Sequence, residues 1–544
     1  EAPAAMDGEA ALAAAVALPL AARAVRGAVL ETRALGQLAV PQPASPAADA
    51  GWTHSTRAES IGGSDLEIKD LTQRSVRVTL GAASRAAGSA ETEPDEEVDV
   101  LVVGGAAAGL AASACCQREG LTCVVIEKNE ASGDIWRSRY HRLHLHDIIE
   151  ECHLPLLQMP ATYPTYPSRE QFARYLANYR SVLGLRVEYR SLVAGMAPSQ
   201  AAGGGWAVDV ARLDGASRKR FVARHVIFAN GVYNDALLPP LEGKERFCGK
   251  LVHSSRYTNA TDLGWANGKR VLVVGWGNSG SEIALDLVEH GARPTLLARS
   301  PQVVVPRDHL QVAQRLLHSH LKPLLSLPFG WLALLPVLVM TDPVLKLAAR
   351  IKYGGSLARA GLPQHWKGPL LRLLTEGVPP MMDVGTVQAC IDGRIAVRRE
   401  GLAGIDADGR VVFSDGSAEP FDGIVLATGY HLFSGHRHFL DAASLQRLGT
   451  GKEAIKTGSV VPGCELRLPN VWALFGRLQM IHDAAPALGR RIARRVHGGS
   501  RWRGAASWVW WVVEHVLIAW AVLAARRRLK QKARHRQSQF SVRC

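Results

Sequence analysis

Two glycine-rich turns, each directly after a short apolar run, constrain the fold of this chain more than any other feature. The first turn covers residues 104–109 after the run 98–103, and the second covers 275–280 after the run 270–274. Each turn opens a segment of helical pattern, and another apolar run follows that segment. A strand, a helix and a strand in this order predict a parallel sheet with right-handed crossovers. We therefore expect two α/β domains, the second inserted in the first.

The expected domain boundaries follow from this repeat. In chain order we expect a low-complexity extension and linker (1–97), a first domain in two pieces (98–265 and 387–496), a second domain between them (266–386) with an apolar helical insert (308–376), and a tail (497–544). The uncharged run 323–341 is near the length that spans a membrane. Because Pro323, Pro328 and Pro336 would interrupt a helix there, we expect a buried or partner-facing insert.

The first turn reads GGAAAG and has the features of a dinucleotide-binding turn. Gly104 and Gly109 stand where a tight turn and close packing of helix on strand require glycine. Gly105 lies between them, and Ala106 occupies the position of the fingerprint's second glycine. Glu127 follows the next apolar run, where a carboxylate accepts hydrogen bonds from ribose hydroxyls. The helix N–H groups after the turn would face a pyrophosphate.

The second turn reads GWGNSG and has all three glycines of the fingerprint, Gly275, Gly277 and Gly280. It follows a strand and opens a helix, as the fingerprint requires. After the next strand the chain has Arg299 and Ser300 instead of an acid. A cation and a hydroxyl suit a 2′-phosphate, so NADP is favoured over NAD.

Two Rossmann-like dinucleotide domains in one chain indicate two cofactors, and the most economical pair is a flavin and a nicotinamide nucleotide. This pair predicts a flavoprotein oxidoreductase. A pyridine nucleotide–disulfide reductase shares the plan but needs a redox cysteine pair on the helix after the first turn. Cys115 and Cys116 stand there and are adjacent, which rarely satisfies disulfide geometry. The eight cysteines contain no CxxC pair, so we expect no metal site.

The net charge of +15 is concentrated at the C-terminal end, because residues 490–544 hold fourteen Lys and Arg against Glu514 alone. These cations flank the apolar, tryptophan-containing run 504–525, which favours a membrane surface over nucleic acid as a partner. The alternative is a docked C-terminal helix with a solvated basic end. We expect an intracellular protein, cytoplasmic or on the cytoplasmic face of a membrane such as the endoplasmic reticulum.

Short motifs carry a resemblance to one family. The pattern FxGxxxHxxxY occurs at Phe247, Gly249, His253 and Tyr257, shortly before the second turn, and residues 427–430 read ATGY after an apolar run. These motifs resemble those of the flavin-containing monooxygenases.

Other segments extend the resemblance over about residues 98–496. Residues 229–231 read ANG, with Asn in place of the Thr of an ATG motif, and residues 136–146 fit the family's W…Y…LxLH segment. Residues 163–168 and 382–386 are most similar to the plant YUCCA branch, the indole-3-pyruvate monooxygenases.

The resemblance implies FAD and NADPH as cofactors, and transfer of one atom of O2 to a small organic substrate through a flavin (hydro)peroxide. The reaction would be oxidative decarboxylation of a 2-oxo acid such as indole-3-pyruvate, or N- or S-oxygenation. His146, His253 and Tyr257 are candidates near the flavin, with no acid or base assigned. The implied cofactor-binding residues are Gly104, Gly105, Ala106, Gly109, Glu127, Lys128, Trp136, Leu145, His146, Gly275, Gly277, Asn278, Ser279, Gly280, Arg299, Ser300, Thr428 and Gly429.

An alternative from another class stays open: a membrane-associated flavoprotein scaffold with weakened catalysis. Ala106, Asn230 and the basic tail favour it, because a fold does not guarantee a function. Retention of FAD by the purified protein discriminates between the two hypotheses.

Overall fold

The computed structural model describes ten stretches of the chain, and the following account concerns these alone. They are residues 56–60, 65–70, 75–79, 95–200, 204–215, 217–316, 330–354, 356–376, 378–448 and 463–498.

The first sheet carries the first glycine turn. In spatial order its strands are β22 (Cys464–Glu465), β23 (Val471–Ala473), β9 (Arg218–Phe228), β4 (Glu96–Val103), β5 (Cys123–Ile126) and β6 (Val187–Glu188), with β7 (Ser191–Pro198) and β8 (Trp206–Arg212) as an antiparallel ribbon beside β9. The central strand β4 pairs in parallel with β5 and β9. Its second half is apolar and buried, which is typical of a parallel strand covered on both faces.

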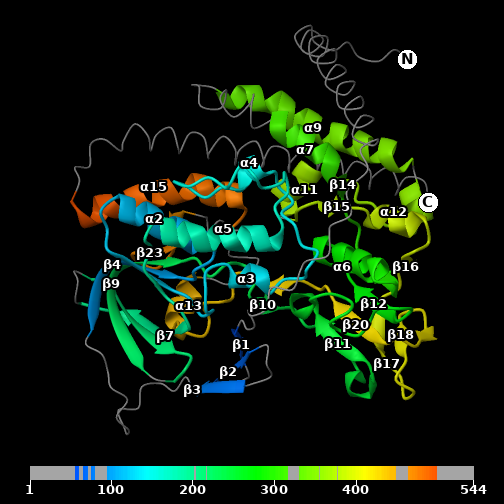
Figure 1. Cartoon of the computed structure of the whole chain (residues 1–544), viewed down its shortest axis with the longest axis horizontal. Coiled ribbons are helices and arrows are strands. Elements are labelled where there is room, and N and C mark those ends of the chain that lie inside the picture. The colour runs from blue at the N-terminus through cyan, green and yellow to red at the C-terminus, as the bar shows by residue number, and fades with distance from the viewer. Residues whose placement is uncertain are drawn as a thin grey trace, which may run out of the picture.

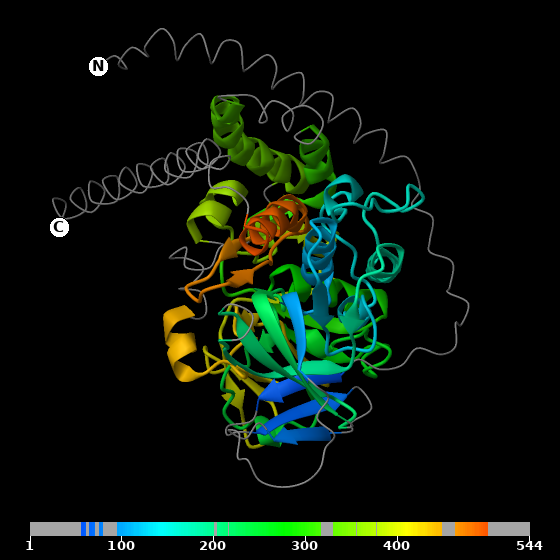
Figure 2. The same cartoon turned by 90° about the vertical axis from the view of Figure 1, so that its left-hand side faces the viewer.

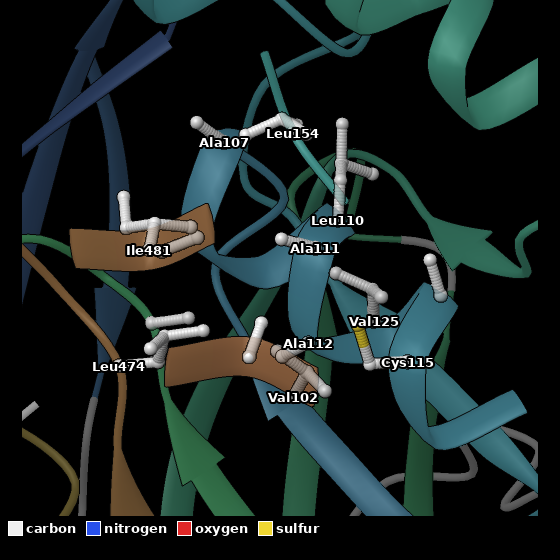
Figure 3. Packing of buried hydrophobic residues seen from close by; sticks show 14 of the residues in the cluster. Val102, Ala107, Leu110, Ala111, Ala112, Cys115, Val125, Leu154, Leu474 and Ile481 are labelled. Carbon is white, nitrogen blue, oxygen red and sulfur yellow. The ribbon is translucent and has the colours of Figure 1, made fainter. Parts of the chain in front are cut away.

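Three helices cover one face of this sheet: α2 (Ala107–Arg118), α5 (Arg169–Val182) and α15 (Leu478–Val496) (Figure 1). Small residues let α2 and α15 approach closely, since a Cβ at Gly489 would stand 2.9 Å from the carbonyl oxygen of Cys115. Figure 3 shows Leu110 and Ala111 of α2 in the same buried cluster as Ile481 of α15. This packing fixes the start of α2, and with it the first turn, on the sheet.

The second sheet carries the second glycine turn and is parallel throughout. In spatial order its strands are β11 (Lys250–His253), β20 (Gly423–Leu426), β12 (Arg270–Val274), β13 (Arg293–Leu297) and β16 (Ala396–Arg398). Helix α6 (Asn278–Glu289) follows β12. An antiparallel group of β17 (Leu402–Ile405), β18 (Val411–Phe413) and β19 (Ala418–Glu419) lies in the same part of the chain.

The expected boundaries of the second domain, 266–386, were wrong. β11 precedes residue 266, and both β16 and β20 follow residue 386, yet all three pair within the second sheet. These strands are only three or four residues long, so their apolar runs do not reveal which sheet they join. The second unit therefore begins before β11 and ends after β20.

The chain crosses between the two units twice, and the two crossings pair with each other. β10 (Asp235–Ala236) lies on the outward crossing and β21 (Tyr430–His431) on the return. They form a short antiparallel ladder, with Ala236 opposite Tyr430. The remaining short elements are α3 (Asp134–Arg137), α4 (Ile149–Cys152), α12 (Thr386–Ile391), α13 (Ala442–Leu448) and the 3₁₀ turns η2 (Lys244–Arg246) and η3 (Ser254–Arg256).

The insert is helical, as expected. It contains α7 (Arg307–Leu316), α9 (Gly330–Tyr353), α10 (Ser356–Arg359) and α11 (Pro369–Glu376), between the paired strands β14 (Val304–Pro306) and β15 (Met381–Asp383). α7 and α9 lie at the upper end of the molecule, beyond α2 and α15 (Figure 2). The expectation that proline would break this run was wrong at Pro336, because α9 continues through Pro336 and Pro343.

Two expectations concern the ends of the chain. The extension 1–97 contains three antiparallel strands, β1 (Thr56–Ser60), β2 (Asp65–Asp70) and β3 (Ser75–Thr79), so its description as low-complexity sequence was wrong for this part. The alternating pattern of SVRVT in β3 is typical of a strand. The apolar run 504–525 lies outside the described residues. Among the described helices, none has both the length and the apolar character that crossing a membrane requires.

Candidate functional site

The first turn is built so that backbone comes unusually close to backbone. Gly104 has a φ of +104°, and its N–H donates to Ile126 O at 2.9 Å. A Cβ there would stand 2.7 Å from Ala229 O, and one at Gly109 would overlap Gly104 O. Ala106 has extended backbone (φ −82°, ψ −167°), which its methyl group tolerates. The turn therefore needs glycine at 104 and 109 but not at 106.

Glu127 lies beside this turn with its carboxylate held by backbone. Its Oε2 accepts a hydrogen bond from Gly105 N at 2.5 Å, and its Oε1 accepts from Asn129 N at 2.9 Å and Asn129 Nδ2 at 2.6 Å. The side chain is 7% exposed. A Cβ at Gly105 would stand 2.9 Å from Glu127 Cβ, so this acid reaches the turn only because residue 105 is glycine. Lys128 follows and is half-buried.

The start of α2 fits the pyrophosphate of a dinucleotide. Ala106 is its N-cap and gives the helix no side-chain cap, so side chains leave the N–H groups of the first turn available to an anion. With Glu127 at the neighbouring strand end, the donors face the position of the phosphates and the acceptor faces that of a ribose. These residues fit the adenosine diphosphate half of FAD.

The second turn repeats this geometry. Gly275 has a φ of +101°, and a Cβ there would stand 2.7 Å from Ala427 O. A Cβ at Gly280 would overlap Gly275 O, whereas one at Gly277 would have no atom within 4 Å. Gly277 is also the N-cap of α6 and leaves the first N–H groups without a side-chain cap. Open space before an uncapped helix start fits a second pyrophosphate.

Arg299 and Ser300 lie just beyond the end of β13, and both are exposed. The carbonyl oxygen of Ser300 accepts a hydrogen bond from Trp276 Nε1 at 2.7 Å, which fixes this corner against the second turn. A guanidinium and a hydroxyl at this strand end suit the 2′-phosphate of NADPH.

The side chain of Asn278 contacts the protein itself, and its role as a cofactor contact stays a prediction. Its Oδ1 accepts from Met382 N at 2.7 Å and its Nδ2 donates to Pro380 O at 3.3 Å. The amide therefore holds the chain that leads into β15 against the start of α6. Ser279 lies beside it in the first turn of α6 and is half-buried.

Trp136 lies on α3, which packs on α5 of the first unit. Its ring meets Phe172 edge-on at 4.7 Å between centroids. A Cβ at Gly133, which precedes α3, would stand 2.5 Å from Ala173 O. Leu145 is buried, and its N–H donates to Pro167 O at 2.8 Å. Both residues support the wall of the first unit at its border with the second.

The segment 139–146 joins the two units. Arg142 donates from Nε and Nη2 to the two carboxylate oxygens of Glu289, each at 2.8 Å. His146 Nε2 lies 2.9 Å from Oε1 of the buried Glu282. Both acids belong to α6. The segment thus fixes α6, the helix that follows the second turn, relative to the loop after the first turn.

Arg169 holds the other side of this loop. The side chains and backbone of Ser168 and Gln171 form a capping box that begins α5, and Arg169 follows directly. Its guanidinium donates to Arg137 O at 2.6 Å and also to Arg139 O. Burial lowers the pKa of Arg169, which remains a cation at any ordinary pH.

His253 and Tyr257 lie in different places. His253 Nε2 donates to Gly429 O at 3.0 Å, between the two units, whereas its Nδ1 accepts from Ser255 N at 3.2 Å. Tyr257 is fully buried, and its hydroxyl donates to Asp286 Oδ2 at 2.5 Å. Tyr257 belongs to the core of the second unit, and its place near the flavin stays a prediction.

The return crossing brings several groups together. Thr428 Oγ1 donates to Leu237 O at 2.5 Å, and Leu237 N donates to Gly429 O at 2.9 Å. The hydroxyl of Tyr430 accepts from Arg139 Nη1 at 2.8 Å. Sequence reasoning quoted Tyr430 only as part of a motif and missed Arg139, since the string WRSRY does not reveal which arginine lacks an acidic partner.

Cysteine chemistry is excluded at the first turn. Cys115 and Cys116 are buried on α2 as free thiols. Burial raises the pKa of Cys115 to about 12 and that of Cys116 well above its ordinary value, so neither is a thiolate at neutral pH. Within the described stretches no group of three or more His, Cys, Asp or Glu side chains could hold a metal ion.

Comparison with known proteins agrees with this geometry. A family model described as pyridine nucleotide-disulphide oxidoreductase matches residues 101–318. Indole-3-pyruvate monooxygenase YUCCA1 from Oryza sativa subsp. japonica is 36% identical over 332 residues, which cover 61% of this chain and 76% of the relative. Indole-3-pyruvate monooxygenase YUCCA6 from Arabidopsis thaliana is 34% identical over 335 residues, which cover 61% and 75%.

Among solved structures, OTEMO in complex with FAD and NADP has a TM-score of 0.56 to this chain at 16% identity. The match covers 74% of this chain and 86% of OTEMO. At this identity the likeness concerns the fold alone.

Proposed function

This chain belongs to the flavin-containing monooxygenase family, with the YUCCA indole-3-pyruvate monooxygenases among its relatives, and on that premise we propose that its reaction is the oxidative decarboxylation of a 2-oxo acid. The chain is an FAD- and NADPH-dependent monooxygenase that acts on a small molecule with O2. The observation that carries the substrate class is the 36% identity to an enzyme named for indole-3-pyruvate.

The proposed reaction conserves atoms and charge. A 2-oxo acid, O2, NADPH and one proton give CO2, water, NADP⁺ and a carboxylic acid that is one carbon shorter. One oxygen atom enters the acid and the other enters water. NADPH supplies the hydride, and FAD supplies the chemistry that activates O2.

We assign the two cofactors to the two turns. FAD binds at residues 104–109, where the N–H groups of α2 hold its pyrophosphate and Glu127 accepts hydrogen bonds from its ribose. NADPH binds at residues 275–280, with Arg299 on its 2′-phosphate. Free cysteines with raised pKa values support oxygenation over disulfide reduction.

The protein's own contribution is position. Hydride transfer needs the reacting atoms about 3–3.5 Å apart, so the two turns must keep a fixed separation. The Arg142–Glu289 ion pair holds α6 to the loop of the first unit. Arg169 restrains that loop from the other side. These contacts orient two bound dinucleotides without supplying an acid or a base.

The test measures products of the full-length protein loaded with FAD. Indole-3-pyruvate, a tertiary amine and a thioether are each offered with NADPH and ¹⁸O2. We expect one CO2 released and one ¹⁸O in the new acid for each NADPH oxidised in the presence of indole-3-pyruvate. An N-oxide or sulfoxide without CO2 from the 2-oxo acid would contradict the substrate class while leaving the monooxygenase activity in place.

We also propose that residues 497–544 contact a membrane surface, on the cytoplasmic side. The cations on both sides of the run 504–525 support this, since basic residues around tryptophan and aliphatic side chains bind anionic interfaces. In a flotation assay with anionic vesicles, the full chain should float with the vesicles, whereas a chain that ends at residue 498 should stay in solution. Equal flotation of both would contradict the proposal.

A further inference from the structure

The loop after the first turn contains one arginine whose charge the described structure leaves unopposed. Arg137 donates to Asp134 at 2.7 Å, and Arg142 donates from two nitrogens to both carboxylate oxygens of Glu289. Arg139 stands between them, and among the described residues no carboxylate forms an ion pair with it. Among these residues its side chain donates one N–H, to the hydroxyl of Tyr430 at 2.8 Å. A guanidinium has five N–H donors, so Arg139 retains capacity for an anion.

Arg139 reaches the border between the two dinucleotide sites. Its partner Tyr430 follows Gly429 on the return crossing, which passes the second turn at Ala427. The outward crossing begins at Ala229 beside the first turn and pairs with Tyr430 through β10. A group bound at Arg139 therefore lies next to the return crossing, which runs from the second turn at Ala427 to the ladder with the outward crossing.

Tyr430 holds the guanidinium at a fixed place and is itself fixed. The Cζ of Arg139 lies 5.9 Å from the centroid of the Tyr430 ring. The imidazole of His253 meets this ring edge-on at 5.1 Å, and the Nε2 of His253 is held by Gly429 O. Tyr430 accepts one N–H of Arg139, which holds the planar guanidinium in a fixed orientation. The other N–H groups of Arg139 can then donate to a ligand.

The cluster opens to solvent at an aromatic side chain. Tyr233 lies 5.6 Å from Tyr430 between ring centroids and is 55% exposed. Tyr233 offers a flat apolar face next to Tyr430, and Tyr430 in turn holds the guanidinium of Arg139. Such a pair matches a molecule that has an aryl group and a carboxylate on neighbouring carbons.

We propose that Arg139 binds the carboxylate of the substrate and that Tyr233 packs against its aryl group, which makes an aryl-substituted 2-oxo acid the preferred substrate. This inference rests on the proposed decarboxylation for its substrate class. The cofactor phosphates have their own partners at the starts of α2 and α6 and at Arg299, so Arg139 is a specificity-determining residue for the substrate.

The first test is binding of a carboxylate that does not react. Indole-3-propionate and its primary amide are titrated into the FAD-loaded full chain, with the visible absorbance of the flavin as the signal. The wild type should prefer the acid, and Arg139→Gln should bind the acid ~10- to 100-fold more weakly, as expected for a lost charged hydrogen bond. The amide should bind both proteins alike. Arg139→Lys should recover part of the difference, because it keeps the charge without the planar fork.

The second test separates substrate from cofactor. In Arg139→Gln, the FAD content and the rate of flavin reduction by NADPH should match the wild type, whereas kcat/KM for indole-3-pyruvate falls ~10- to 100-fold. Arg220→Gln, an exposed arginine paired with Asp209, is the matched control and should change neither. The melting temperature and FAD content report folding, and Arg139→Lys serves if the glutamine variant does not fold.

The outcomes distinguish the proposed decarboxylation from the proposed role of Arg139. Unchanged carboxylate binding in Arg139→Gln would overturn the inference, and so would a loss confined to NADPH affinity, since Arg139 would then bind a cofactor phosphate. If the wild type releases no CO2 from any 2-oxo acid, the proposed reaction fails, while titration with indole-3-propionate still decides whether Arg139 holds a carboxylate.

Discussion

The two glycine turns share one backbone device and differ in the side chains around it. Both begin with a glycine of positive φ that lies against the carbonyl of the next crossing, Ala229 in the first and Ala427 in the second. The first turn adds a buried acid, Glu127, and the second an exposed cation, Arg299. On the proposed assignment, each turn provides a place for a pyrophosphate, and the residue at the end of the following strand selects which nucleotide binds.

The strongest way to break this comparison is to close each turn separately. In Gly109→Ala the new methyl overlaps Gly104 O, and in Gly280→Ala it overlaps Gly275 O. We expect the first variant to be purified without FAD. The second should keep its yellow flavin but be reduced by NADPH roughly 100-fold more slowly or worse, given the cost of such overlap. Visible absorbance and stopped-flow reduction measure both. Loss of both ligands in both variants would show that the turns are not independent.

Glu127→Ala tests the acid at the first turn. It removes the acceptor for a ribose and leaves Gly105 N without its partner. We expect the Kd for FAD to rise ~10- to 100-fold with no change in NADPH affinity, measured by flavin fluorescence on the deflavinated protein. Glu127→Gln keeps the shape and should lose less. An equal effect on NADPH would contradict the assignment of this acid to the first turn.

Arg299→Ala tests the cation at the second turn. Because Arg299 is exposed, solvent screens its charge, and we expect the KM for NADPH to rise about 10-fold. The KM for NADH should stay the same, since NADH lacks the 2′-phosphate. Arg293, exposed at the start of the same strand, provides the control variant Arg293→Ala. If Arg299→Ala weakens NADH equally, the residue does not read the phosphate.

The smallest expected effect comes from exchanging the second position of the two turns. Ala106→Gly should tighten FAD binding only ~2- to 3-fold, because the shorter phosphate contact is offset by the backbone entropy of glycine. Gly277→Ala places a methyl group in open space before α6 and should weaken NADPH by a similar factor. Titration of each nucleotide decides. A loss of FAD from Ala106→Gly would show that the methyl group is part of the site.

Local features of the sequence predicted the elements that carry the turns. β12 begins and ends as expected, and α6 ends one residue earlier than expected. In such cases the apolar run and the glycine that bounds it mark where the element begins and ends. The short strands β11, β16 and β20 were assigned to the wrong unit, because pairing between strands so distant in the chain is decided by tertiary packing rather than by local pattern.

The partners of side chains were less accessible than their positions. The sequence placed Glu127 and Arg299 at the correct strand ends, since the fingerprint has a fixed spacing. It did not predict the pairing of Arg142 with Glu289, nor that no carboxylate of the described stretches forms an ion pair with Arg139. Ion pairs between the two units depend on how the units pack against each other. The sequence alone does not show which of the four arginines within residues 137–169 meets an acid.

The paired crossings at β10 and β21 have a mechanical consequence. An inserted body attached by one strand could swing and twist freely, whereas one attached by two strands that are hydrogen-bonded to each other pivots about a single axis. The Arg142–Glu289 ion pair adds an attachment between the units that does not involve the crossings, so a change in their relative orientation must break this pair as well as bend the paired strands.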